Sequence, residues 1–316
     1  MSSYNGLEVV AAAAIAALNS EIVIHPMDTI ITRMQSKDYQ SIYKYSNGSL
    51  RRTLFTGLYQ GFGPTLLAGI PSSAAFFITY EASKTTFEKA QTAGYFRGVP
   101  KSIFHATSSA VAELVACAFL NPAEVLKQNA QISRQSSQQG NGPTVSIRIM
   151  KQFFQQPSAL WSGYWVLVAG QLPSICLTFC LYESFKESWY EGRNLGNETI
   201  SQQIKASILC AGFAGGCSSW FFVPIDVVKT RMRLAVGEEM QLSSHSVSNP
   251  GHKIPRLRSS MRSKSRLLSV QVIQDLFLKE GFPGFFRGSG LTCLAATLGS
   301  AMYIGCYEGI KLALEA

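Results

Sequence analysis

Three segments of this chain place a carboxylate two residues after a proline, and two of them place a base three residues after the carboxylate. They read Pro26-Met-Asp28-Thr-Ile-Ile31, Pro122-Ala-Glu124-Val-Leu-Lys127 and Pro224-Ile-Asp226-Val-Val-Lys229, and in the first an isoleucine takes the place of the base. On a helix, residues three apart share a face, so each acid and base can point at a neighbouring helix. A proline kinks such a helix, and three kinked helices around an axis can pair acid to base and close one end of a central cavity.

Each of these segments is followed, further along the chain, by a second acid–base segment. These segments are Tyr80-Glu81…Lys84, Tyr182-Glu183…Lys186 and Tyr307-Glu308…Lys311, and they can close the other end in the same way. The three prolines lie 96 and 102 residues apart (122 − 26 and 224 − 122). A motif that recurs at a near-constant period predicts a repeated structural unit. We therefore expect three tandem modules, over residues 1–95, 98–192 and 200–316.

The composition predicts a membrane protein and gives no sign of a nucleic-acid-binding surface. Charged residues make up 15% of the chain and apolar residues 47%, whereas roughly a quarter of a soluble domain is charged. The net charge of +9 falls mostly between the apolar runs, where it can meet anionic lipid headgroups. Most of the apolar spans are long enough to cross about 30 Å of hydrocarbon. We expect an all-α membrane protein with six transmembrane helices, over about 7–35, 64–88, 103–132, 164–188, 204–233 and 290–313.

The sequence gives no indication of catalysis. The seven cysteines lie almost entirely within apolar runs and form no Cys-x-x-Cys pair, and the four histidines are scattered. A glycine-rich loop ending in Lys-Ser or Lys-Thr is also absent. We therefore expect no enzyme activity, no metal site and no cofactor.

Each module carries an aromatic-x-Gly element between its two helices. These elements are Tyr59-Gln-Gly61, Trp161-Ser-Gly163 and Phe286-Arg-Gly288. Glycine at a helix start frees backbone N–H groups, which predicts a site for a phosphate or a lipid headgroup. A simple turn explains the same glycines, so both interpretations stay open here.

The third module is longer than the other two, and its extra residues lie around 237–268. This segment is Ser-rich and basic. We expect a disordered loop on the positive side of the membrane, with a localisation signal or an RNA-binding arm as alternatives.

The three repeated motifs resemble those of the mitochondrial carrier family, and the resemblance covers the whole chain. It implies a six-helix, pseudo-threefold bundle in the inner mitochondrial membrane, with both termini in the intermembrane space. It also implies one central site that is exposed alternately to either side, exchange of one small metabolite for another, and cardiolipin-like lipid at Gly61, Gly163 and Gly288. We further expect a monomer.

The same resemblance assigns two gates. The matrix gate would consist of Asp28, Glu124, Lys127, Asp226 and Lys229, with Gln35 and Gln131 as glutamine braces nine residues after their prolines. The cytoplasmic gate would consist of Glu81, Lys84, Glu183, Lys186, Glu308 and Lys311. Because Ile31 replaces the family's base in the first repeat, we expect Asp226 to lack its partner. Two matrix pairs would then remain, Asp28 with Lys127 and Glu124 with Lys229.

Two further carboxylates indicate the kind of solute. Glu113 lies nine residues before its proline, where the other repeats have Ala17 and Gly215, and Glu21 lies five residues before its own proline. Positions −9 and −5 are four apart and share a helical face, and a carboxylate within a membrane span usually lines a water-filled path. These positions, with the sequence around Glu113, resemble the S-adenosylmethionine carriers of the family. Two cavity carboxylates suit a solute with sulfonium and ammonium centres.

The fourth helix departs from that resemblance. Those carriers have an Arg-Glu pair where this chain has Gly170-Gln171. We expect Gln171 and Ser174 to contact the solute instead, and Gly170 to leave room for a planar base. A carrier for another nucleotide-, cofactor- or amino-acid-like solute, or a carrier-like membrane anchor that no longer transports, remains an alternative.

Overall fold

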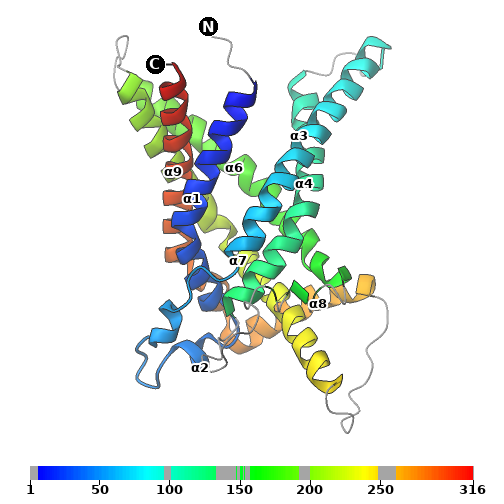
Figure 1. The fold of residues 1–316 in the computed structure, drawn as a ribbon, viewed down its shortest axis with the longest axis vertical. Coiled ribbons are helices and arrows are strands. Elements are labelled where there is room, and N and C mark those ends of the chain that lie inside the picture. The colour runs from blue at the N-terminus through cyan, green and yellow to red at the C-terminus, as the bar shows by residue number, and fades with distance from the viewer. Residues whose placement is uncertain are drawn as a thin grey trace. The chain divides into compact units, whose positions relative to one another are not determined.

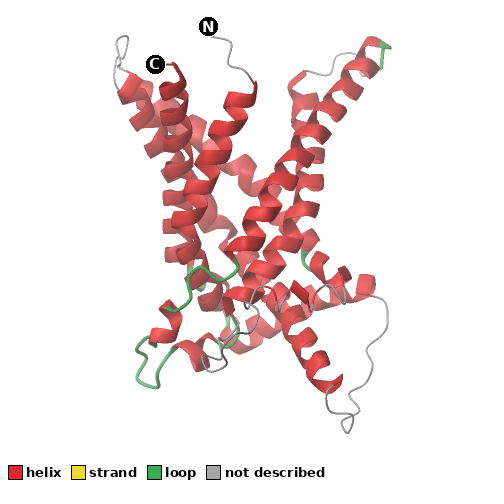
Figure 2. Cartoon of the chain, viewed as in Figure 1, coloured by secondary structure: helices red, strands yellow, loops and turns green. Residues whose placement is uncertain are grey.

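The computed structural model describes residues 6–95, 101–132, 147, 150, 151, 153, 157–191, 200–247 and 261–315. The described residues fold almost entirely as helices and contain no strand, apart from an isolated bridge between Lys44 and Leu50 (Figure 2). The long helices are α1 (Gly6–Gln35), α3 (Phe62–Thr92), α4 (Lys101–Ile132), α6 (Tyr164–Glu191), α7 (Ile200–Val247) and α9 (Ser289–Glu315). They confirm the six helices predicted from the sequence. Shorter elements are α2 (Tyr39–Tyr43), α8 (Met261–Glu280) and the 3-10 helices η1 (Arg52–Phe55), η2 (Pro157–Trp161) and η3 (Phe282–Phe286).

The chain divides into two compact units. The first comprises Met1–Tyr59, Pro173–Val227 and Glu280–Ala316, and the second comprises Gln60–Leu172 and Val228–Lys279. In the first unit α1 packs against α9, and the beginning of α1 lies at the same end as the end of α9 (Figure 1). In the second unit α3 packs against α4. In both units the second helix of one repeat thus packs against the first helix of the next repeat, counting the first repeat as following the third.

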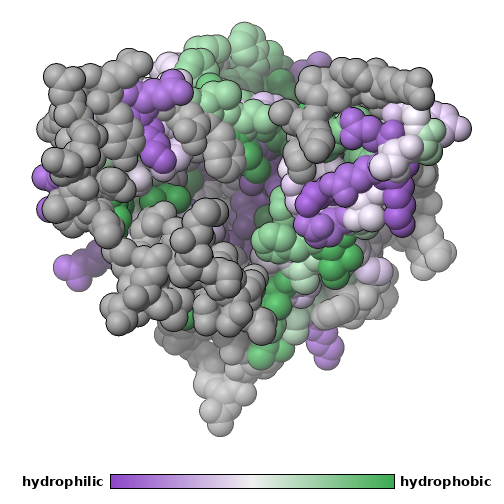
Figure 3. Space-filling view, turned by 90° about the horizontal axis from the view of Figure 1, so that it is seen from above, coloured by the Kyte–Doolittle hydropathy of each residue, from purple (hydrophilic) through white to green (hydrophobic). Residues whose placement is uncertain are grey.

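Several helices have the length and composition of membrane spans. Five segments of the described chain qualify, namely Phe62–Thr92, Thr107–Ile132, Pro157–Trp189, Ile204–Glu238 and Phe282–Cys306. Large apolar side chains are exposed on them, including Leu67 at 77% and Ile70 at 79%. On the face seen in Figure 3, hydrophobic residues, in green, and hydrophilic residues, in purple, gather in separate patches. Such exposure is typical of helices that face lipid, because hydrocarbon tails solvate these side chains.

Helix occupies more of the third repeat than the sequence predicts. α7 continues to Val247 and α8 begins at Met261, so the expected loop over 237–268 is wrong at both of its ends. Residues 248–260 lie outside the described part of the chain. The run Glu238-Glu-Met-Gln-Leu242 consists of good helix formers and follows directly on α7, which explains the longer helix.

The aromatic-x-Gly glycines make the same kind of contact in each repeat. Gly61, Gly163 and Gly288 all have a positive φ, of 85°, 77° and 81°. A Cβ built on each of them would face the first helix of the next repeat, at Lys127 for Gly61, at Arg233 for Gly163, and at Met34 and Gln35 for Gly288. The approach is closest at Gly61, where the Cβ would lie 2.7 Å from the carbonyl oxygen of Lys127. All three glycines therefore serve a left-handed turn, and Gly61 also permits a close approach to α4.

Candidate solute site and gates

A buried arginine links α7 to α4. The side chain of Arg233 on α7 is fully buried, and its guanidinium donates to Oε2 of Glu124 at 3.1 Å and to Oδ1 of Asn121 at 3.0 Å. Asn121 in turn donates to the carbonyl oxygen of Leu160, at 2.8 Å, in η2. Asn129 donates to the carbonyl oxygen of Arg233 itself, at 3.1 Å. One side chain thus links α4, α7 and the turn before α6.

Sequence reasoning missed Arg233, although a signal for it was present. It lies nine residues after Pro224, the spacing at which Gln35 and Gln131 follow their own prolines. The sequence predicts braces only where a glutamine stands at this position, so the arginine of the third repeat is not among them. Glu124 forms an ion pair with Arg233. Both Glu124 and Lys229 have further interactions, and the expected pair between these two residues stays a prediction.

The other predicted matrix-gate residues also have interaction partners. Asp28, Lys127, Asp226, Lys229, Gln35 and Gln131 each take part in a hydrogen bond, an ion pair or another electrostatic interaction. The expectation that Asp226 lacks a partner is therefore wrong. Ile31 is only 8% exposed and packs as an apolar residue, so a lysine there would introduce a charge into a closed site.

In the first unit the end of α1 is held by backbone carbonyls. Arg33 donates to the carbonyl oxygens of Leu54 and Thr56, both at 2.7 Å, at the end of η1. Thr29 donates to the carbonyl oxygen of Leu58 at 2.6 Å. Leu58 precedes the aromatic residue of the first aromatic-x-Gly element, as Leu160 does in the second. The first and second repeats therefore bind the same carbonyl with different side chains of their first helices.

The predicted cytoplasmic-gate residues are only partly described. Glu81 and Lys84 lie one turn apart on α3, with their charged atoms at 3.9 Å, and Lys186 lies over the ring of Tyr182 at 5.5 Å. The side chains of Glu183, Glu308 and Lys311 fall outside the described residues. The pair between Glu81 and Lys84 is exposed and lies within one helix, so it contributes little stability by itself.

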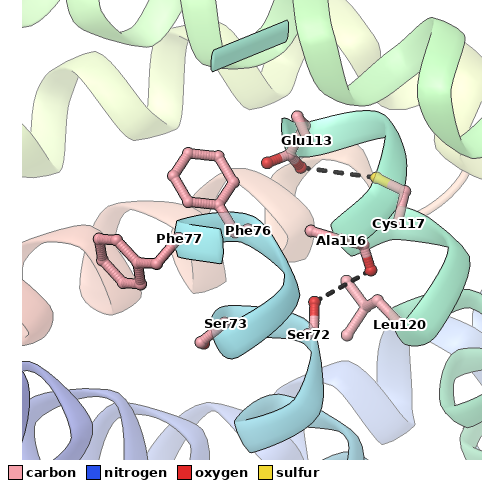
Figure 4. A pocket seen from close by; sticks show the side chains of 8 residues that line it. All are labelled: Ser72, Ser73, Phe76, Phe77, Glu113, Ala116, Cys117 and Leu120. Carbon is pink, nitrogen blue, oxygen red and sulfur yellow. Dashed lines mark hydrogen bonds between the residues drawn. The ribbon is translucent and has the colours of Figure 1, made fainter. Parts of the chain in front are cut away.

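Glu113 lines a pocket between α3 and α4. The pocket has a volume of about 180 Å³, and its lining residues are Ser72, Ser73, Phe76, Phe77, Glu113, Ala116, Cys117 and Leu120 (Figure 4). The Cys117 thiol donates to Oε1 of Glu113 at 3.5 Å, and the Ser72 hydroxyl donates to the carbonyl oxygen of Ala116 at 3.0 Å. The second of these bonds holds the two helices together beside the pocket. Cys117 occupies position −5 from its proline, the position that Glu21 occupies in the first repeat.

Glu21 belongs to the first unit, in surroundings of its own. Its Oε1 lies 3.2 Å from Nδ1 of His25, one turn further along α1. The His25 ring is fully buried and stacks on Tyr59, whose hydroxyl donates to the carbonyl oxygen of Ile22 at 3.2 Å. Glu21 is therefore held by a histidine, and Glu113 by a thiol.

The predicted contacts on α6 fall on both sides of the division between the units. Gly170 and Gln171 belong to the second unit and Ser174 to the first, and all three are partly buried. The Ser218 hydroxyl donates to the carbonyl oxygen of Ser174 at 3.0 Å, and the two hydroxyl oxygens lie 3.3 Å apart. A hydroxyl has one hydrogen, so Ser174 supplies the hydrogen between the two hydroxyls. Ser174 then keeps lone pairs for a solute but has no free donor.

Three two-helix repeats, with apolar spans, a carboxylate-lined pocket and ion pairs near the helix ends, define a helical membrane carrier. The sequence matches the family described as mitochondrial carrier protein over residues 2–91, 100–193 and 201–316, that is, in all three repeats. The chain therefore belongs to the mitochondrial carrier family. Members of this family are transporters of small metabolites, and a multi-pass location in the inner mitochondrial membrane agrees with the family and the apolar helices.

Several similar proteins are described as S-adenosylmethionine carriers. The mitochondrial S-adenosylmethionine carrier protein of Danio rerio is 28% identical over 302 residues, which cover 95% of this chain and 94% of that protein. The protein of the same description from Mus musculus is 28% identical over 297 residues, covering 94% and 91%. The S-adenosylmethionine mitochondrial carrier protein homolog of Drosophila melanogaster is 27% identical over 300 residues, covering 94% and 89%.

Proposed function

We propose that the protein carries S-adenosylmethionine or a related cationic metabolite across the inner mitochondrial membrane by alternating access. The observation that carries this proposal is the carboxylate of Glu113, which lines a pocket on a helix apolar enough to span the membrane. An ionisable group at such a position is costly and usually belongs to a solute path. The similarity to several S-adenosylmethionine carriers supports the same class of solute.

In this proposal Glu113 and Glu21 hold the cationic centres of the solute. Gln171 contributes amide hydrogen bonds, and Ser174 accepts a hydrogen bond from an ammonium group through its free lone pairs. Gly170 has no side chain, so a planar base can lie beside α6 there. The arginine of the related carriers corresponds to Gly170, which has no side chain, so the solute carboxylate meets the neutral Gln171 instead.

We propose the two gates from the similarity of the repeated motifs to those of the family. Asp28, Glu124, Lys127, Asp226 and Lys229, with Gln35 and Gln131, close the cavity on the matrix side. Glu81, Lys84, Glu183, Lys186, Glu308 and Lys311 close it on the opposite side, and both termini face the intermembrane space. We propose a monomer that exchanges solutes, with anionic lipid bound near Gly61, Gly163 and Gly288.

Uptake into liposomes tests the proposal. Glu113→Gln and Glu21→Gln keep the shape of the side chain and remove its charge. Each should raise the apparent KM for S-adenosylmethionine at least about tenfold, because a charge-assisted contact is lost. Asp38→Gln is the matched control, since Asp38 is exposed at the start of α2. Wild-type uptake of S-adenosylmethionine by both glutamate variants would refute the cationic-solute assignment and leave only the family.

A further inference from the structure

The pocket of Glu113 is lined by a carboxylate and by aromatic rings. Glu113 and Cys117 come from α4, whereas Phe76 and Phe77 come from α3. In Figure 4 the carboxylate of Glu113 lies on the side of the pocket from which the ring of Phe76 projects. A group that enters the pocket therefore meets a negative charge and a ring together.

The Phe76 ring is held in a fixed orientation. It stacks on the ring of Tyr80, one turn further along α3, with centroids 6.3 Å apart and an interplanar angle of 2°. It also meets Phe77 edge to face, at 5.6 Å between centroids and 90°. Because two neighbours set its plane, Phe76 presents its π surface without a large loss of side-chain entropy on binding.

This combination suits one class of cation better than others. A primary ammonium group has three N–H donors and needs acceptors around it. A sulfonium or fully methylated ammonium group has no such donor and carries a diffuse charge. Aromatic faces attract groups of this kind, and cages of aromatic rings recognise quaternary ammonium ligands. A carboxylate beside the ring supplies the remaining attraction.

We propose that Phe76 and Glu113 form an onium subsite, which holds the sulfonium or methylated ammonium group of the solute between a π face and a carboxylate. The assignment deepens the proposed function and rests on it. The pocket of about 180 Å³ is smaller than the roughly 300–1,000 Å³ typical of whole-ligand sites. It therefore takes the charged group alone, and the rest of the solute lies outside it. The Cys117 thiol orients the carboxylate through its bond to Oε1.

The test compares S-adenosylmethionine with S-adenosylhomocysteine, which lacks the methyl group and the charge at sulfur. Uptake of each is measured in liposomes with wild type, Phe76→Leu, Phe76→Tyr and Phe87→Leu. Phe87 is the matched control, because it lies on the same helix but its ring packs on Phe104, outside the pocket. Phe76→Leu should reduce the preference for the sulfonium about fivefold. Phe76→Tyr and Phe87→Leu should keep the wild-type preference. An unchanged preference in Phe76→Leu would overturn the subsite while leaving S-adenosylmethionine transport in place.

A binding measurement covers the case in which the wild type takes up no S-adenosylmethionine. The probe is trimethylsulfonium, with neutral dimethyl sulfide as its comparison, and the readout is the thermal midpoint of the purified protein. Stabilisation by the cation alone that disappears in Phe76→Leu and persists in Phe87→Leu would support the subsite even if the proposed solute were wrong. Absence of stabilisation, or equal stabilisation in Phe76→Leu, would overturn it.

Discussion

The first helices of the first and third repeats both carry a buried arginine after their proline, but the two arginines have different kinds of partner. Arg33 is 4% exposed and donates to backbone carbonyls at the end of η1. Arg233 is fully buried and pairs with the carboxylate of Glu124 on another repeat. The first arrangement lies in one unit and the second in the other, so each can be considered by itself.

The difference concerns what can change during transport. A carbonyl oxygen carries no titratable charge and stays with its own turn, so the bonds of Arg33 form a permanent tether within the first repeat. Glu124, by contrast, is a proposed gate residue, and an ion pair between helices can break when the helices separate and form again when they close. The energetic cost of the two losses should differ as well, because breaking a buried ion pair strands a charge.

Removal of the Arg233 charge should have the largest effect. Arg233→Gln places in the third repeat the residue type that follows the other two prolines, but it leaves Glu124 without its ion-pair partner. We expect a loss of about 3 kcal/mol in the free energy of unfolding, as for other broken buried pairs. Thermal and denaturant unfolding of the purified protein measure this loss.

A double-mutant cycle shows whether Glu124 carries that effect. Once Glu124→Gln is present, Arg233→Gln should cost clearly less, with a coupling energy of about 1 kcal/mol or more. Lys229→Gln provides the matched comparison, since the sequence predicted Lys229 as the partner. A stronger coupling of Glu124 to Lys229 than to Arg233 would show that the ion pair described here is not the dominant one.

Loss of the bonds from Arg33 to backbone carbonyls should lower the free energy of unfolding less than loss of Arg233 does, and it should show no coupling to a carboxylate. Arg33→Gln keeps one donor group for several carbonyl oxygens, and we expect a loss of about 2 kcal/mol, the cost of leaving buried acceptors unsatisfied. Apparent affinity for the solute should not change, because the contacts of Arg33 lie within the turn of the first repeat. If Arg33→Gln and Arg233→Gln changed the apparent KM for the solute equally, the distinction between the two arginines would be lost.

The glycines of the two units offer a finer comparison. Gly61 and Gly288 have nearly the same φ, but a Cβ on Gly61 would lie 2.7 Å from a backbone oxygen, whereas a Cβ on Gly288 would meet Met34 at 3.8 Å. Backbone strain is therefore shared, and only Gly61→Ala adds a clash with α4. We expect Gly61→Ala to cost about 1 kcal/mol more than Gly288→Ala. Equal losses of unfolding free energy in the two variants would show that backbone strain alone sets the cost of the substitutions.

The sequence was sufficient for the six long helices and the repeats, because period and apolar length are local properties of the chain. It did not predict α8 or the extension of α7. The partners of charged side chains were predicted less well. The spacing of the motifs pairs Glu124 with Lys229 and gives no place to Arg233, which reaches Glu124 from one turn further along α7. Asp226 was expected to lack a partner because Ile31 is not a base, although a carboxylate can find its partner on any neighbouring segment. Side-chain reach and packing choose between such partners, and neither follows from spacing.

The neighbours of Glu113 in the pocket could not be predicted from spacing either. Glu113 was recognisable as a carboxylate at an unusual position, but its neighbours were not. Phe76 comes from another helix and Cys117 from position −5, where only the first repeat has an acid. Their approach to Glu113 depends on the register of α3 against α4. A sequence period within one helix does not fix that register.

The smallest effect should come from the serine pair between α6 and α7. Ser174 and Ser218 bond to each other, so loss of either hydroxyl should cost about 1 kcal/mol of stability or less. Ser174→Ala should also raise the apparent KM for S-adenosylmethionine about threefold, since a neutral acceptor for the solute is lost. Ser218→Ala breaks the same serine pair but removes no proposed solute contact, so it should leave KM unchanged. Uptake kinetics and unfolding of both variants measure the two effects separately. Equal KM values for Ser174→Ala and Ser218→Ala would reduce Ser174 to a packing contact, like Ser72 between α3 and α4.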